Sequence, residues 1–346
     1  MKILALQLKR IGDLVLTTPA LEALRRAMPD AGITLAVHES SSGLLSAIPQ
    51  ISAGIIFGPG RGWTPWQQVL TGRFDVVLDF TGTDRSALAA WLSRAKRRVT
   101  FEWAQKRQLR AKAYHEFVDS PVRDAHTVDH YMHLLRPLGI EGGDMLSPKL
   151  SIPDAARREA ERLLQSAGVT GPFAVMHPGS ARLEKYWQPE RWAQVIHDLR
   201  EKHGLICVVT GGSDPQERQH LDAIFAAVDS TKGSDPTKVV DFAGKGNLLT
   251  FAAILEKARL VLSCDTAAVH LAAAFQTPQI VLFGPTNPFH WRPRHRLAVV
   301  FSSAQPDGPI TEFNPRMKGA PMDELSAGVV TRAIDSVLQN PASVDA

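Results

Sequence analysis

The 346-residue sequence has few cysteines and no long hydrophobic run. Its two cysteines, Cys207 and Cys264, lie in apolar segments typical of strands, so we expect core thiols in a reducing compartment, with neither a disulfide nor a metal site. No stretch of about twenty apolar residues is present. Lys9 and Arg10 interrupt the first apolar run too early for a signal peptide. These absences predict a cytoplasmic protein.

The glycine fingerprint of dinucleotide-binding proteins is also missing. The first strand, turn and helix, within residues 2–29, contain no GxGxxG. Gly12 is followed instead by Asp13, which places a carboxylate where such a fold offers glycines to a pyrophosphate. This pattern argues against a dehydrogenase. Asp13 is either a reactive carboxylate or simply the N-cap of the helix.

Positive charge is concentrated in one segment, although the net charge of the chain is only +4. Residues 94–112 contain eight basic side chains and a single acidic one, Glu102. Subtracting these from the totals of 39 and 35 leaves 31 basic and 34 acidic residues elsewhere, a balance of −3. Such a segment either attracts an anionic partner, namely nucleic acid, a membrane surface or an acidic substrate, or is a solvated face. The basic residues are Arg94, Lys96, Arg97, Arg98, Lys106, Arg107, Arg110 and Lys112.

Short apolar runs alternate with helical patterns in both halves of the chain, and the periodicity fades between them, at residues 139–153. The pattern predicts an α/β protein with two Rossmann-like doubly wound domains, residues 1–150 and 151–346, facing across a cleft. The last helical segment, about 323–338, is a candidate to pack back on the first domain. Strands are expected at 2–8, 33–37, 54–57 and 75–79, and then at 173–177, 205–210, 239–242, 259–263 and 277–283.

Residues 259–288 have the layout of a binding edge, with a strand, a turn, a helix, a second strand and a loop. Asp265 and Thr266 lie where the helix begins, and a helix N-terminus presents unpaired N–H groups and partial positive charge to a phosphate. His270 follows Thr266 by four residues and therefore shares its helix face. The alternative is an ordinary strand–helix–strand unit with a capped helix and a core histidine.

The other strand-end loops of the second half add to this edge, because ligands of doubly wound sheets bind beyond the carboxyl ends of the strands. They contribute small residues, hydroxyls and Lys185, without the Walker A spacing. A diphosphate bound there and the Asp13 carboxylate across the cleft predict group transfer from a nucleotide donor, with a carboxylate as general base. The loops are 177–180 with 185–187, 211–213, 265–267 and 284–286.

Two further segments are candidate sites. Arg61 and two tryptophans lie in the sequence GPGRGWTPW, which is either a packed surface loop or a substrate-facing one. A predicted helix at 126–138 carries three histidines, and His126 and His130 are four residues apart. No third ligand follows at a recognised spacing, so we expect no metal site there.

Three segments resemble the heptosyltransferases of glycosyltransferase family 9, which build the inner core of lipopolysaccharide. They are RIGDLVLTTPALEALR, then HPGS with KYWQPERW, and then SCDTAAVHLAAA followed by VLFGPT. They occur in the family order and span most of the chain. The resemblance implies a GT-B fold, an ADP-heptose donor in the C-terminal half, an acceptor in the N-terminal half and an inverting single displacement without a required cofactor.

The resemblance also implies residue roles. Asp13 matches the general base that deprotonates the acceptor hydroxyl, and Lys185, in a K-x-W pattern, matches the lysine on the donor phosphates and sugar. Ala267 stands where family members often have glycine, and the acidic pattern before Glu217 departs from the family, so no ribose ligand is assigned. The expected donor-binding residues are Ser180, Lys185, Asp265, Thr266, Ala267 and His270.

The basic segment then has an expected partner, an acceptor with Kdo carboxylates and lipid A phosphates at the inner membrane, which predicts a peripheral location there. Nucleic acid is not expected, because only Phe101 and Trp103 are aromatic within the segment. The alternatives are a relative that uses another sugar nucleotide or a protein acceptor, and a non-catalytic nucleotide-sugar-binding protein. Candidate acceptor ligands are Arg10, Arg61, Arg97, Arg98, Lys106 and Arg107.

Overall fold

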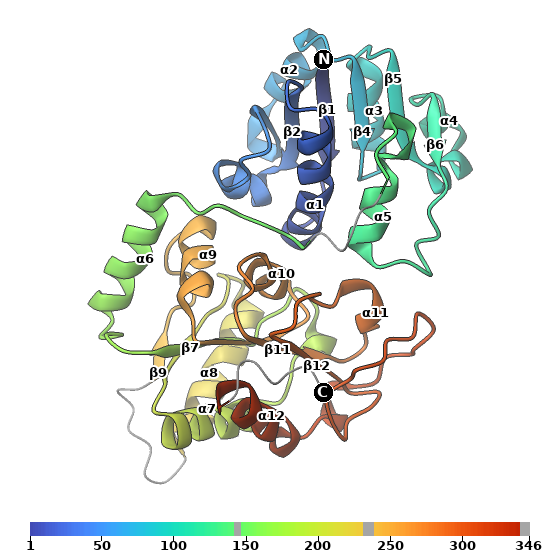
Figure 1. Ribbon diagram of the computed structural model, residues 1–346. Helices are drawn as coiled ribbons and strands as arrows, with labels where there is room; N and C mark the ends of the chain where they lie inside the picture. Colours follow the sequence, from blue (N-terminus) through green and yellow to red (C-terminus); the bar gives the residue numbers. More distant parts are fainter. Residues whose placement is uncertain (142–146, 231–238, 340–346) are drawn as a thin grey trace. The chain divides into compact units, whose positions relative to one another are not determined.

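The computed structural model describes residues 1–141, 147–230 and 239–339 and divides into two compact units, Met1–Ser151 and Ile152–Ala346 (Figure 1). Each unit contains a six-stranded parallel sheet with helices between successive strands. The prediction of two doubly wound α/β sheets is confirmed. Part of the predicted linker, residues 142–146, lies outside the described residues.

The sheet of the first unit is built around β1, which pairs with β2 on one side and β4 on the other. Ile3 of β1 is in register with Ile33 and with Val76. The strands are apolar on both faces because both faces are covered. The strand order is β3-β2-β1-β4-β5-β6, with β1 (Lys2–Gln7), β2 (Gly32–His38), β3 (Ala53–Phe57), β4 (Val76–Asp79), β5 (Arg97–Phe101) and β6 (Glu116–Val118).

Two groups of helices cover this sheet (Figure 1). α2 (Thr64–Thr71) and α3 (Asp84–Leu92) pack on the face that carries Leu4 and Leu6. α1 (Ile11–Ala27) and α5 (Thr127–His133) pack against each other. The contact between α1 and α5 brings together side chains more than one hundred residues apart, Asp13 and Tyr131.

The second unit repeats the topology of the first. Its order, β12-β11-β10-β7-β8-β9, is the first order read from the opposite edge, so the order reverses between β1 and β4 in one sheet and between β7 and β10 in the other. Such a switch point is where doubly wound sheets bind ligands. The strands are β7 (Phe173–His177), β8 (Ile206–Val209), β9 (Val239–Asp241), β10 (Leu260–Cys264), β11 (Gln279–Phe283) and β12 (Ala298–Ser302).

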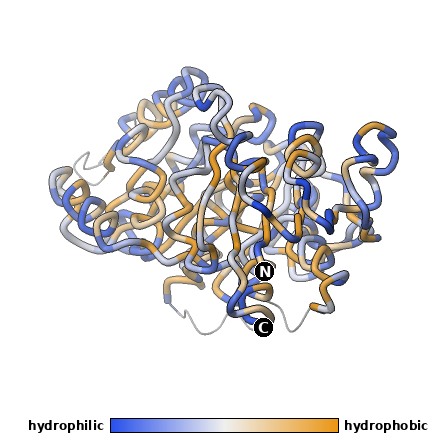
Figure 2. The backbone as a smooth tube through the Cα atoms, turned by 90° about the horizontal axis from the view of Figure 1, so that it is seen from above, coloured by the Kyte–Doolittle hydropathy of each residue, from blue (hydrophilic) through white to orange (hydrophobic). Residues whose placement is uncertain are grey.

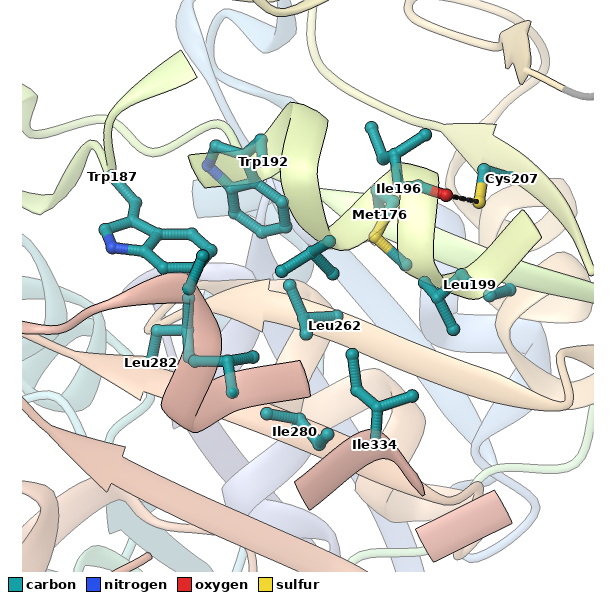
Figure 3. Close-up of a cluster of buried hydrophobic side chains, with 14 of the residues drawn as sticks. Met176, Trp187, Trp192, Ile196, Leu199, Cys207, Leu262, Ile280, Leu282 and Ile334 are labelled. Atoms are coloured by element: carbon teal, nitrogen blue, oxygen red, sulfur yellow. Dashed lines mark hydrogen bonds between the residues drawn. The ribbon is translucent and has the colours of Figure 1, made fainter. Parts of the chain in front are cut away.

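The core of the second unit lies between its sheet and one layer of helices, and includes Trp187 and Trp192 (Figure 3). α7 (Pro189–His203), α8 (Pro215–Asp229) and α12 (Ala327–Gln339) form this layer, whereas α6 (Asp154–Ser166), α9 (Leu248–Lys257) and α10 (Ala267–Ala274) pack together elsewhere on the unit. The last helix, considered from sequence for packing on the first domain, buries Val330, Ile334 and Val337 in this core and lies against α7.

The buried hydrophobic residues lie on the strands and on the helices that pack against them, and Figure 2 shows the alternation of hydrophobic (orange) and hydrophilic (blue) stretches along the chain. No helix within the described ranges combines the length and the apolar character needed to cross a membrane. Three strands were not predicted. β5 and β6 lie in or just after the basic segment, where charged residues hide the apolar alternation, and β12 follows a stretch rich in proline, arginine and histidine.

Candidate active site

The switch point of the second unit holds a lysine–aspartate pair. Lys185 ends the short 3₁₀ turn η5 (Leu183–Lys185) after β7, and Asp265 directly follows β10. The Lys185 Nζ lies 2.5 Å from Asp265 Oδ2 and donates a second bond to the Asp265 carbonyl oxygen at 3.1 Å. The two side chains are only 12% and 9% exposed. The structure therefore brings two of the predicted donor-binding residues into contact.

The K-x-W spacing explains how Lys185 is held at the strand ends. Trp187 is fully buried, and its indole Nε1 donates to the Leu325 carbonyl oxygen at 2.8 Å. Its ring packs edge-on against Trp192, with centroids 5.4 Å apart (Figure 3). Because Trp187 is locked in the core, the backbone two residues earlier is fixed and the lysine is presented at the edge of the sheet.

The helix α10 begins beside this pair. Thr266 is its N-cap, and its Oγ1 accepts a hydrogen bond from the Ala268 N–H at 3.3 Å. Asp265 is paired with Lys185 and does not cap the helix. Ala267 is the first helical residue, and His270 lies one turn further on, 5% exposed. Asp265, Thr266, Ala267, His270 and Lys185 therefore form one group at the end of β10.

Glycines after β7 and β8 make room for a carboxylate that the sequence analysis did not assign. Glu217, in the first turn of α8, accepts the Gly212 N–H through Oε1 at 2.9 Å. A Cβ on Gly179 would lie 1.8 Å from the same oxygen, and one on Gly211 would lie 2.9 Å from it. Ser180, the remaining predicted donor residue, lies in the Gly179 loop and accepts the Arg182 N–H at 3.3 Å.

A pocket of about 460 Å³ adjoins the Lys185 turn. Leu183, Glu184 and Tyr186 line one side, and residues of the loop after β11 and of the 319–323 segment line the rest. The sequence did not predict it, since the 319–323 segment is remote from the Lys185 turn in the chain. At the end of β7, His177 Nδ1 lies 2.9 Å from Thr210 Oγ1, and burial lowers the pKa of His177 to about 4. His177 is therefore neutral at pH 7.

In the first unit, Asp13 is held by a tyrosine that the sequence analysis missed. The helix α1 begins at Ile11, so Asp13 lies in its first turn and not at the N-cap position, which Arg10 occupies. The buried Tyr131 hydroxyl donates to Asp13 Oδ1 at 2.6 Å. Burial, reinforced by the Asp13 carboxylate, raises the pKa of Tyr131 well above its ordinary value, so this donor keeps its proton. Lys9 Nζ lies 5.9 Å from the centre of the Tyr131 ring.

A second carboxylate of this unit has a structural role. Asp79, at the end of β4, is fully buried and accepts the backbone N–H groups of Thr81 and Gly82 at 2.8 and 3.0 Å, together with the Tyr114 hydroxyl. Burial raises the pKa of Asp79. The Thr81 Oγ1 in turn accepts the Leu8 N–H at 2.7 Å, which ties the β4 loop to the end of β1.

The basic segment separates into structural and exposed side chains. Arg97 bonds both carboxylate oxygens of Glu116 at 2.8 Å and the Pro137 carbonyl at 2.7 Å. Arg98 donates to the Ala113 and Ala95 carbonyls at 2.6 and 2.9 Å. These contacts argue against the expected role of Arg97 and Arg98 as acceptor ligands, because their guanidinium groups already hold β5 to its neighbours.

The other acceptor candidates remain accessible. Arg10, Lys106 and Arg107 are exposed. Arg61 lies 3.1 Å from a Glu39 carboxylate oxygen, and its side chain is 45% exposed. Beside it, Trp66 packs edge-on against Phe57, whereas Trp63 is 63% exposed.

Two repeats of one doubly wound sheet, the second with an ion-paired lysine beside a helix N-terminus, are typical of glycosyltransferases of the GT-B class. More particularly, the chain belongs to glycosyltransferase family 9 (heptosyltransferase), whose family model matches residues 63–319.

Similarities to known proteins are consistent with this family. The chain is 26% identical to lipopolysaccharide heptosyltransferase 3 of Escherichia coli over 82% of its own length and 83% of the relative. Its fold is similar to that of the E. coli ADP-heptose lipopolysaccharide heptosyltransferase II, with a TM-score of 0.80, 18% identity and coverage of 99% and 100%. It is also similar to E. coli heptosyltransferase WaaC solved with ADP-2-deoxy-2-fluoro heptose, with a TM-score of 0.72, 20% identity and coverage of 97% and 99%.

Proposed function

We propose that this enzyme transfers heptose from ADP-heptose to a hydroxyl of the lipopolysaccharide inner core, on Kdo or on heptose, with inversion at the anomeric carbon. The observation that carries the proposal is the Lys185–Asp265 pair at the start of α10, a cation beside a helix N-terminus at the switch point. The names of its relatives support the same reaction: lipopolysaccharide heptosyltransferase 3, and WaaC solved with an ADP-fluoroheptose.

The second unit would bind the donor. Lys185 and the first N–H groups of α10 attract the diphosphate, and Asp265, Thr266 and His270 face the sugar and the adjoining phosphate. Ser180 adds a hydroxyl from the β7 loop. Ala267 has a methyl side chain, which leaves the start of the helix open for close approach of a phosphate. These donors stabilise the charge that builds on the diphosphate as the glycosidic bond breaks.

The first unit would supply the base. The acceptor hydroxyl attacks the anomeric carbon of the heptose, its proton passes to the carboxylate of Asp13, and the bond from that carbon to the ADP oxygen breaks. The bonding electrons leave with ADP, whose added negative charge is met by Lys185 and α10. Because one displacement forms one glycosidic bond and breaks another, the configuration inverts.

Tyr131 is the positioning residue for this base. Its hydroxyl donates a hydrogen bond of 2.6 Å to Asp13 Oδ1. This bond fixes the carboxylate and leaves Oδ2 to take the acceptor proton. Arg10 and Arg61 lie in loops after β1 and β3, at the carboxyl edge of the same sheet, and are suited to the anionic groups of the acceptor.

The reaction is tested by incubating the enzyme with ADP-heptose and either Kdo-terminated lipid A or its heptosylated product, and following the mass of the acceptor. A gain of one heptose on one of the two acceptors supports the proposal and identifies the position. Parallel reactions with ADP-glucose and UDP-glucose measure donor selectivity. Transfer of glucose in preference to heptose, or hydrolysis without transfer to either acceptor, would contradict it.

A further inference from the structure

Gln7 is a polar residue at the end of β1, a strand that is otherwise apolar in the core. The four residues before it are apolar and fully buried, and Gln7 itself is 0% exposed. Among the described residues, its side-chain oxygen Oε1 has no hydrogen-bond partner. An unsatisfied buried acceptor destabilises the folded chain, and an apolar side chain would avoid this cost. The stability of the sheet therefore does not account for a glutamine at this position.

The side-chain nitrogen of Gln7 is bonded to the helix that carries the proposed base. Gln7 Nε2 donates to Thr17 Oγ1 at 2.7 Å, and both side chains are fully buried. Thr17 Oγ1 in turn donates to the backbone carbonyl of Asp13 at 2.7 Å. Because the two bonds share the Thr17 oxygen, each strengthens the other. Gln7 therefore ties the end of β1 to the first turn of α1, where Asp13 lies.

The Gln7 side chain also contacts the tyrosine that holds the Asp13 carboxylate, from the helix α5 that packs on α1 (Figure 1). Burial and the Asp13 charge raise the pKa of Tyr131, and a hydrogen bond from the Gln7 side chain acts in the opposite direction. A hydrogen bond lowers the pKa of a phenol when the phenol oxygen accepts it, so the Gln7 amide donates to Tyr131. The Tyr131 hydroxyl donates in turn to Asp13 Oδ1 at 2.6 Å.

We propose that Gln7 is a positioning residue for Asp13, through hydrogen bonds from its amide nitrogen to the hydroxyls of Thr17 and Tyr131. The bond to Tyr131 polarises the phenolic O–H group and strengthens its bond to the carboxylate. The bond to Thr17 fixes the backbone of Asp13. Together they restrict the carboxylate to one orientation, in which Oδ2 is available for the acceptor proton. The inference rests on the proposed role of Asp13 as the base.

The test is Gln7→Met, which keeps the length of the side chain and removes its donors. We expect kcat for heptose transfer to fall about three- to tenfold, as for the loss of one neutral hydrogen bond, with an unchanged KM for ADP-heptose. The ionised carboxylate of Asp13 is then less stabilised, so the acidic limb of the kcat/KM profile should move to higher pH. A purely structural link would change the melting temperature and leave the pH profile in place.

A double variant tests whether Gln7 acts through Tyr131. Because Tyr131→Phe removes the hydroxyl that Gln7 polarises, adding Gln7→Met to Tyr131→Phe should move the pH profile no further. The matched control is Gln50→Met, which should leave kcat and the pH profile unchanged. Gln50 is also a buried glutamine bonded to α1, since its Nε2 donates to Glu22 Oε2 at 2.8 Å, and its Oε1 likewise has no partner among the described residues.

The other titratable groups on the elements around α1 are the same in every variant, so a difference between variants reports the change at Gln7. These elements are β1 with the loop that follows it, α5, and the 3₁₀ helix η1 (Glu39–Ala47). The groups are Lys2, Lys9, Arg10, Glu39, Asp129, His130 and His133.

Wild-type kcat and pH profile in Gln7→Met would overturn the proposal, as would a further pH shift when Gln7→Met is added to Tyr131→Phe. If Gln7→Met does not fold, Thr17→Val takes its place, because it removes the hydroxyl that Gln7 bonds and keeps the shape of the side chain. It should move the acidic limb in the same direction, and an unchanged profile would overturn the proposal. A wild type that transfers heptose to neither acceptor contradicts the proposed reaction itself, and this inference with it, before any variant is compared.

Discussion

The two switch points share one topology and differ in their chemistry. Between β7 and β10, the second unit joins a cation to the start of a helix, through Lys185 and Asp265. Between β1 and β4 of the first unit, the loops that follow the two strands are bonded to each other, because Thr81 Oγ1 accepts the Leu8 N–H. Asp13 remains half-buried there, held by Tyr131. The same fold thus has a lysine–aspartate pair beside a helix N-terminus in one unit and a half-buried carboxylate in the other, which is the division that the proposed transfer needs.

The largest effect should come from removing the carboxylate. Asp13→Ala takes away the proposed base, and a positioned general base contributes about 10²- to 10⁴-fold. We expect a loss of transfer of that size in a mass-based assay, with the affinity for ADP-heptose almost unchanged. Asp13→Asn is the control that keeps the bond from Tyr131 and should be equally inactive. Near wild-type turnover in either variant would disprove the role of Asp13.

Removing the cation should weaken donor binding about 100-fold, since a charged hydrogen bond to a phosphate contributes about 1.5 to 3 kcal/mol. Lys185→Ala also leaves Asp265 buried without its partner, which is expected to cost about 3 to 5 kcal/mol of stability. The matched control is Lys185→Ala combined with Asp265→Asn. It should recover much of the melting temperature but not the donor affinity. Recovery of both would assign Lys185 a purely structural role.

Tyr131→Phe should lower kcat about tenfold, because a hydrogen bond to a charged group is lost while the ring stays in place. The ionised form of the base loses a donor, so the acidic limb of the kcat/KM profile should move to higher pH. Lys9, Arg10 and His130 also lie near this site and are unchanged in the variant. Tyr114→Phe, at the buried Asp79, is the control for structural loss and should leave the pH profile in place.

Acid should loosen the second unit before the first. Burial lowers the pKa of His177, His220 and His295 to about 4, below the ordinary value of 6.5. The unfolded chain therefore binds more protons in this range, and stability falls as the pH drops from 6.5 to 4. In the first unit, burial lowers the pKa of His130 to about 3 and also lowers the pKa of His133, and both act in the same direction. Hydrogen exchange followed by mass spectrometry would resolve the two units; equal loss of protection in both would contradict the expectation.

The smallest effect is expected at Arg97. The side chains of the Arg97–Glu116 ion pair are 41% and 31% exposed. Arg97→Gln should therefore lower the free energy of unfolding by about 1 kcal/mol or less and leave the KM for the acceptor unchanged. Arg10→Gln should have the opposite signature, with a raised KM for the acceptor and the same melting temperature. A raised acceptor KM for Arg97→Gln would return Arg97 to the acceptor site.

Much of the fold could be predicted from the sequence, because buried parallel strands have continuous apolar runs. β7 begins and ends at the predicted residues, 173–177. β5 was not predicted because it begins with two charged residues, Arg97 and Arg98. Their partners, Glu116 and the Ala113 carbonyl, become neighbours only once β6 is in place.

The candidate site likewise has one part that local motifs predict and another that depends on tertiary packing. The group around Lys185 and Asp265 could be found from local motifs, since KYW and SCDTAAVH are each continuous in the sequence. The bond from Tyr131 to Asp13 spans 118 residues and depends on the packing of α5 against α1, for which the sequence has no local signal. The space for the Glu217 carboxylate likewise depends on the missing side chains of Gly179 and Gly211, which lie in two different loops.

The most direct test is calorimetric titration of the full-length wild type, Asp13→Ala and Lys185→Ala with ADP-heptose, with ADP-glucose, UDP-glucose and NAD as comparison ligands. We expect selective binding of ADP-heptose by the wild type and by Asp13→Ala with dissociation constants that agree within a small factor, and binding weakened about 100-fold in Lys185→Ala. Equal binding by Lys185→Ala, or no binding of any ADP-sugar by the wild type, would contradict the assignment of the donor site to the switch point of the second unit.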